Sequence, residues 1–140
     1  MENAQFAPVG SIILAAMLVL LGAGILIIAM ISRRGGPERN FADADGFDRR
    51  SVIWASAEAW QASHRANAPW LVTASIGVLV CGLISFGVIM MQGPSEATGA
   101  VLTLLCVALF WVIAFCTVAA IRGRVAAKKV LAQQARDRNG

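Results

Sequence analysis

The segment WLVTASIGVLVCGLISFGVIMM, residues 70–91, decides the fold of this chain. It contains no Lys, Arg, Asp, Glu or His. It is also longer than the roughly 20 residues that an α-helix needs to cross about 30 Å of hydrocarbon. Because lipid cannot satisfy backbone polar groups, a run of this kind is expected to be helical. Residues 70–91 therefore predict a transmembrane helix.

Two more uncharged apolar runs of similar length, residues 9–31 and 98–121, lie before and after this segment. The chain is 58% hydrophobic and 14% charged, whereas soluble domains are about 25% charged. No Lys or Arg precedes the first run, which is also too long for the apolar part of a signal peptide, so we expect it to be a retained helix. The prediction is an all-α integral membrane protein, with residues 1–140 forming a single membrane domain with three transmembrane helices.

The polar and aromatic segment IWASAEAWQASHRAN, residues 53–67, comes just before the central run. Read as a helix, it places Trp60 and His64 on one stripe, and Glu58 and Arg65 on the other side. This pattern is typical of a helix that lies in the headgroup region with its aromatic edge toward the lipid. We therefore predict a fourth, amphipathic helix at the membrane interface.

The Lys and Arg residues distinguish the two sides of the membrane. Half of the 12 lie between the first and second runs, and the other half lie in the tail, residues 122–140. Short segments rich in these residues stay in the cytoplasm. The protein is therefore predicted in a bacterial plasma membrane with its N-terminus outside the cell. The loop at residues 32–52, the interfacial helix and the tail are predicted on the cytoplasmic side. Gly93 and Pro94 predict a tight turn that makes the second and third helices antiparallel neighbours.

Small residues recur along one face of each run, and such faces let helices approach closely in lipid. We expect these faces to point inward. They comprise Ser11, Ala15, Gly22 and Ala29 in the first run, Thr73, Gly77, Cys81 and Ser85 in the second, and Gly99, Thr103, Cys106 and Thr117 in the third. The three cysteines show no spacing typical of metal ligands and are interpreted as packing residues.

The tail carries basic residues close to the third run, namely Arg122, Arg124, Lys128 and Lys129. Beside a membrane, each is attracted to anionic lipid headgroups by about 1 kcal/mol. The lipid bilayer is therefore the expected partner of these residues. Nucleic acid is not predicted as a partner, because membrane sidedness already accounts for the basic residues.

No metal or cofactor site is predicted. Asp43, Asp45 and Asp48 resemble part of a calcium-binding loop. Phe41 and Val52, however, occupy the positions where that loop requires a ligand.

The sequence also indicates a protein that is not an enzyme. Ser63 and the single His, His64, are adjacent in sequence, so on a helix their side chains point about 100° apart. Ser56 is interpreted as a helix N-cap or a first-turn residue, with Glu58 favourable near the positive helix start. Two interpretations of His64 remain open: a side chain bonded to the loop backbone or to headgroups, or a pH-sensitive contact that faces a ligand.

The order of these features resembles the SdpI/YhfL family of small bacterial membrane proteins. The family pattern S-x-x-x-W-x-x-x-H-R is matched by Ser56, Trp60, His64 and Arg65. Asn40 lies upstream, and residues 46–50, GFDRR, stand where the family has a Gly/Arg element. The resemblance implies immunity to a secreted peptide toxin, or a signal passed to a cytoplasmic regulator.

Two functional hypotheses follow, and a third is weaker. The chain could act by itself in immunity or signalling, with a peptide toxin or a cytoplasmic regulator as partner. It could instead be an accessory subunit that docks on another membrane protein or on a copy of itself. An oligomeric channel or carrier is the third hypothesis, although no charged residue marks a lumen. The candidate contact residues are Trp54, Glu58, Trp60, His64 and Arg65.

Overall fold

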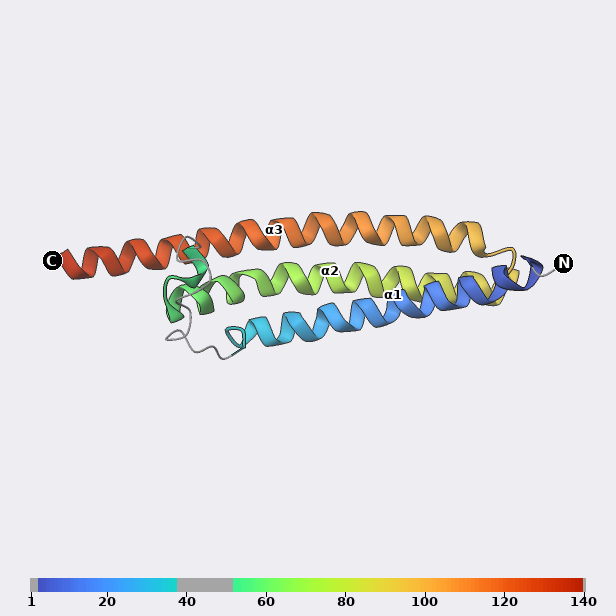
Figure 1. The fold of residues 1–140 in the computed structure, drawn as a ribbon, viewed down its shortest axis with the longest axis horizontal. Coiled ribbons are helices and arrows are strands. Elements are labelled where there is room, and N and C mark those ends of the chain that lie inside the picture. Colours follow the sequence, from blue (N-terminus) through green and yellow to red (C-terminus); the bar gives the residue numbers. More distant parts are fainter. Residues whose placement is uncertain (1–2, 38–51, 140) are drawn as a thin grey trace. The chain divides into compact units, whose positions relative to one another are not determined.

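The computed structural model describes residues 3–37 and 52–139. These residues form helices and turns, and no strand (Figure 1). The elements are α1 (Asn3–Arg33), the short 3-10 helix η2 (Val52–Trp54), α2 (Ala57–Gln92) and α3 (Thr98–Asn139). By length and composition α1, α2 and α3 could each cross a membrane. The prediction of an all-α chain with three long apolar helices is therefore confirmed.

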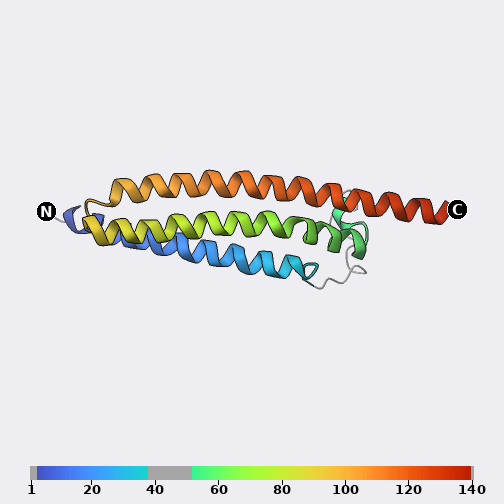
Figure 2. The same ribbon diagram turned by 180° about the vertical axis from the view of Figure 1, so that it is seen from behind.

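The separate interfacial helix predicted over residues 53–67 is not present. Instead, α2 begins at Ala57 and continues through Pro69 to Gln92 as one helix (Figure 1 and Figure 2). A proline inside a helix removes one backbone hydrogen bond. Ending the helix there would leave up to four carbonyls without a partner inside the helix. Residues 57–67 are therefore the first three turns of α2, and Trp54 belongs to η2.

The chain forms two compact units, and each of the three long helices contributes to both. The first unit comprises Met1–Leu26 and Val72–Phe115. The second unit comprises Ile27–Leu71 and Cys116–Gly140.

Glycines allow α1 and α2 to pack closely in the first unit. A Cβ atom added at Gly22 would lie 2.7 Å from Leu79 Cγ, and one at Gly82 would lie 2.8 Å from Val19 Cγ2. The buried Ser75 hydroxyl donates a hydrogen bond of 2.8 Å to the carbonyl oxygen of Gly22. Since an unpaired hydroxyl is costly in an apolar interior, this bond and the close glycine contacts determine how the two helices meet.

Two further hydrogen bonds join helices of the first unit to their neighbours. The hydroxyl of Ser11 in α1 donates to the carbonyl oxygen of Pro94, in the turn before α3, at 2.7 Å. Trp111 Nε1 in α3 donates to the carbonyl oxygen of Thr73 in α2 at 3.0 Å. The same indole ring fills the space beside Gly77, where a Cβ atom would overlap it.

The small residues predicted to face inward have different positions in the three helices. Those of α1, namely Ser11, Ala15, Gly22 and Ala29, are buried. In α2, Cys81 and Ser85 are buried, and Thr73 and Gly77 are half-buried. The prediction for α3 is wrong, because Gly99, Thr103, Cys106 and Thr117 are exposed. The buried positions of α3 are Val101, Ala108, Ala119, Gly123 and Ala127. The Thr103 hydroxyl donates to the Gly99 carbonyl oxygen of its own helix, so it does not need a partner on another helix.

Large apolar side chains cover the outside of the first unit. Met90 and Met91 at the end of α2 are 85% and 88% exposed, and Phe110 of α3 is 76% exposed. A soluble monomer rarely presents apolar surface on this scale. Helices with this surface are suited to a lipid environment.

Candidate functional site

Of the five contact residues predicted from the sequence, Trp60, His64 and Arg65 lie beside the turn that ends α1, in the second unit. Gly35 and Gly36 have φ values of 107° and 85°, a backbone region that glycine enters without a steric penalty. The amides of Gly35 and Gly36 donate to the carbonyl oxygens of Ser32 and Ile31 at 3.0 and 3.1 Å. The two glycines thus terminate α1 and direct the chain back toward α2.

His64 of α2 lies directly against this turn. A Cβ atom added at Gly36 would be 2.6 Å from His64 Cδ2, so only glycine fits beside the imidazole ring. Ser32 Oγ and His64 Nδ1 are 3.3 Å apart and share a hydrogen bond. Burial lowers the pKa of His64 by penalising its charged form. The neutral ring is therefore the form that packs at the end of α1.

Two tryptophans extend the ring contacts of His64. The rings of Trp60 and His64 are 4.3 Å apart between centroids, with an angle of 60° between their planes. The rings of Trp54 and Trp60 are 4.7 Å apart at 45°. Trp60 Nε1 also donates to the carbonyl oxygen of Pro37 at 3.3 Å. We call Trp54, Trp60 and His64 the aromatic stack; it connects η2, the start of α2 and the turn after α1.

The start of α2 has the expected cap. The backbone amide of Ala59 donates to Ser56 Oγ at 3.1 Å, which confirms Ser56 as the N-cap. Glu58 lies in the first turn, where the positive helix start favours a carboxylate. The cap explains why the helix begins at Ala57 and not at Ile53.

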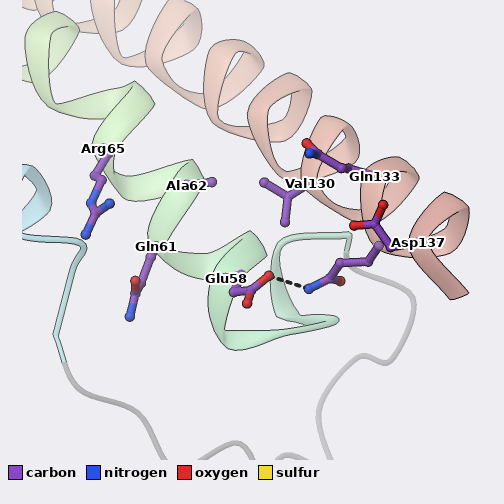
Figure 3. Close-up of a pocket in the computed structure, with 8 residues that line it drawn as sticks. Glu58, Gln61, Ala62, Arg65, Val130, Gln133 and Asp137 are labelled. Carbon is purple, nitrogen blue, oxygen red and sulfur yellow. Dashed lines mark hydrogen bonds between the residues drawn. The ribbon is translucent and has the colours of Figure 1, made fainter.

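An open groove of about 410 Å³ lies between the first turns of α2 and the last turns of α3 (Figure 3). It is lined by Glu58, Gln61, Ala62, Arg65, Val130, Gln133, Gln134 and Asp137, and we call it the polar groove. Figure 3 shows Ala62 and Val130 pointing toward one another. Gln134 Nε2 donates to the carboxylate of Glu58 at 2.5 Å and so connects the two helices.

The turn after α1 also reaches one wall of this groove. A Cβ atom added at Gly35 would lie 3.3 Å from Gln61 Cγ and 3.8 Å from Arg65 Nε. Both side chains line the polar groove. A movement of the turn would therefore displace groove-lining side chains.

A second groove, also of about 410 Å³, has a different character. It is lined by Ala66, Trp70, Arg122, Val125, Ala126 and Lys129, and we call it the basic groove. The guanidinium carbon of Arg122 lies 5.9 Å from the centre of the Trp70 ring. Arg124 and Lys128, which the sequence placed with the headgroup-binding residues, do not line it.

Ser63, the residue before His64, contacts α3 and not the turn after α1. Ser63 is 2% exposed and packs with Asn67 against Gly123 of α3, where a Cβ atom would overlap both side chains. Asn67 Oδ1 is buried without a hydrogen-bond donor among the residues that the structure describes. Ser63 and His64 thus face different helices, which agrees with the expected angle between them.

The five predicted contact residues fall into two groups. Trp54, Trp60 and His64 pack on one another, whereas Glu58 and Arg65 line the polar groove. Asn40, residues 46–50, Phe41 and the three aspartates of the rejected calcium pattern lie outside the described residues. Within the described ranges, no group of three or more His, Cys, Asp or Glu side chains is placed to hold a metal ion.

Sequence reasoning missed the roles of Gly35, Gly36 and Gln134. The adjacent glycines directly after an apolar run were a usable signal for a helix-ending turn. No local signal indicated Gln134, because its partner Glu58 is 76 residues away.

Comparison of the chain with protein-family models, with curated proteins and with solved structures gave no match.

Proposed function

We propose that this chain is a non-enzymatic multi-pass protein of the bacterial plasma membrane that acts in peptide-toxin immunity or signalling. Its N-terminus would be outside, and the second unit would face the cytoplasm. Three apolar helices support the membrane location. The concentration of Lys and Arg after the first and third runs supports the orientation. The resemblance of residues 56–65 to the SdpI/YhfL family suggests the biological role.

The observation that carries this proposal is the contact of the α1 turn with both the aromatic stack and the polar groove. Gly36 lies against His64, and the adjacent Gly35 lies against Gln61 and Arg65. A ligand that shifts the end of α1 would therefore alter the groove wall. A ligand transmits a signal in this way only if it binds one conformation of the protein more tightly than the other. The turn contacts α2 only through the side chains beside Gly35 and Gly36, so a small movement of the turn would change these contacts.

The polar groove fits a segment of a cytoplasmic protein that carries charged side chains. Glu58 and Asp137 offer carboxylates, Arg65 offers a guanidinium group, and Ala62 and Val130 offer a small apolar surface. Charged side chains at the edge of an interface mainly set partner choice and association rate. The proposed partner would therefore present both a cation and an anion to the groove.

The test is recovery of partners from native membranes with a tagged full-length chain. The variant E58A/R65A removes one acid and one base from the groove, and E96A/R124A removes the same charges at exposed positions outside it. We expect a cytoplasmic protein that copurifies with wild type and with E96A/R124A, but not with E58A/R65A. Cells carrying E58A/R65A should also resist a peptide toxin less well than cells carrying wild type. Equal recovery with both variants, together with unchanged toxin sensitivity on gene deletion, would refute the proposal.

A second candidate function, an accessory subunit, is favoured by the exposure of α3. Only 11% of its apolar window is buried, compared with 39% for α2. Its exposed face includes the small residues Gly99, Thr103 and Cys106, which would suit close packing against another transmembrane helix. Extraction in mild detergent tests this candidate. Migration of the chain alone would exclude a stable larger complex.

A further inference from the structure

The basic groove combines cationic and apolar side chains in the second unit. On α3, Arg122, Val125 and Lys129 follow one another at intervals of three and four residues, so they lie on one face of the helix. Trp70 and Ala66 of α2 form the facing wall. None of the described residues that line this groove is acidic. Its chemistry is therefore suited to an anion attached to an apolar group.

The position of Arg122 is constrained by Trp70. Its guanidinium carbon lies 5.9 Å from the ring centre, within the range of a cation–π contact. The guanidinium group carries five N–H donors in a planar fork. A planar fork of donors is well suited to phosphate oxygens.

The groove also lies at the expected depth for a lipid headgroup. Trp70 is the first residue of the uncharged run 70–91, and Arg122 is the first charged residue after the run 98–121. Tryptophan is enriched where the hydrocarbon meets the headgroups, and basic pockets between transmembrane helices bind anionic headgroups. Free inorganic phosphate would use the two cations but would leave the apolar wall empty.

We propose that the basic groove binds one anionic phospholipid. Arg122 and Lys129 contact its phosphate, and Trp70 and Val125 pack against its glycerol and the first carbons of its acyl chains. The inference differs from a general attraction of the basic tail to the membrane, because Arg124 and Lys128 take no part. It is independent of the polar groove, which is lined by other residues of α2 and α3.

Native mass spectrometry of the full chain in detergent tests the inference. The purified protein is titrated with phosphatidylglycerol or with phosphatidylcholine, and the dissociation constant of the first bound lipid is measured. The variant R122A/K129A removes the two groove cations, and R124A/K128A removes the same charge beside the groove. We expect R122A/K129A to weaken phosphatidylglycerol binding about ten-fold or more, and R124A/K128A to change it less than about two-fold. Phosphatidylcholine should bind wild type much more weakly.

Three results would overturn the inference. Equal weakening by the two double variants would indicate attraction by net charge alone. Equal affinity for phosphatidylcholine and phosphatidylglycerol would show that the groove does not select the net charge of the headgroup. Displacement of the lipid by millimolar inorganic phosphate would identify a free-anion site. Circular dichroism checks that the variants are helical. If the double variant does not fold, the single variants R122Q and K129Q replace it, and each is expected to weaken phosphatidylglycerol binding several-fold.

Discussion

Replacing Gly36 with alanine tests the contact between the α1 turn and the aromatic stack. Gly36 has a φ of 85°, and a left-handed conformation costs a residue with a side chain about 1–2 kcal/mol. The new Cβ atom would lie 2.6 Å from His64 Cδ2, a distance that no real contact shows. The imidazole ring must therefore move away from the turn.

The size of the effect follows from the contacts that this movement weakens. The aromatic pair of His64 with Trp60 contributes about 0.5–1.5 kcal/mol, and the hydrogen bond to Ser32 a further 0.5–1.5 kcal/mol or so. Gly36→Ala should lower the free energy of unfolding by roughly 2–5 kcal/mol when backbone strain is included. Gly93 is a matched control, since its φ is 86° but a Cβ atom there meets nothing within 4 Å. Gly93→Ala should cost about 1–2 kcal/mol, from strain alone.

The assay is unfolding of the full chain in mild detergent by a denaturing detergent, followed by helical circular dichroism. Hydrogen exchange of residues 57–67 provides a local measurement, and it should accelerate for Gly36→Ala but not for Gly93→Ala. In a His64→Ala background the additional penalty at Gly36 should vanish, because the ring that clashes is absent. Equal losses for the two glycine variants, or an undiminished penalty without His64, would refute the proposed contact.

Three other measurements use the same unfolding assay. Burial lowers the pKa of His64 from its usual 6.5, so the unfolded chain binds the proton at a higher pH than the folded chain does. The free energy of unfolding should therefore fall as the pH drops below about 6.5. His64→Phe should remove this dependence. Trp111→Phe deletes the hydrogen bond to the Thr73 carbonyl oxygen and should cost about 0.6 kcal/mol; increased stability would contradict that role. Gly123→Ala should cost about 1–3 kcal/mol, because its Cβ atom overlaps Asn67 and Ser63. Asn67→Ala should relieve part of this loss, and the overlap with Ser63 should account for the rest.

Both proposed grooves depend on residues of α2 and α3 that are distant in sequence. Glu58 and Gln134 are 76 residues apart, yet their side chains share a hydrogen bond. Trp70 and Arg122 likewise come from different helices and lie within cation–π distance. The groove variants E58A/R65A and R122A/K129A share no residue, so a failure of one proposal leaves the other testable.

The sequence alone determined the number and kind of the long helices. Residues 70–91 and the two similar runs need no tertiary information, because the cost of exposing backbone or charge to lipid depends only on local composition. The cap at Ser56 was equally predictable, since the hydroxyl bonds to an amide three residues away. Signals of this kind act within one helix and survive any arrangement of its neighbours.

Only the tertiary structure decided which face of each helix is buried and that α2 is one continuous helix. Small residues occur on more than one side of α3, and the buried side carries Val101 and Ala108, whereas Thr103 is exposed. The separate helix expected over residues 53–67 is instead continuous with the apolar run that follows it, and Pro69 lies inside α2. The partner of His64 was also undetermined, because Ser32 is 32 residues away. The rotation of a helix about its axis is set by the sum of its contacts with other helices, and local sequence does not contain that sum.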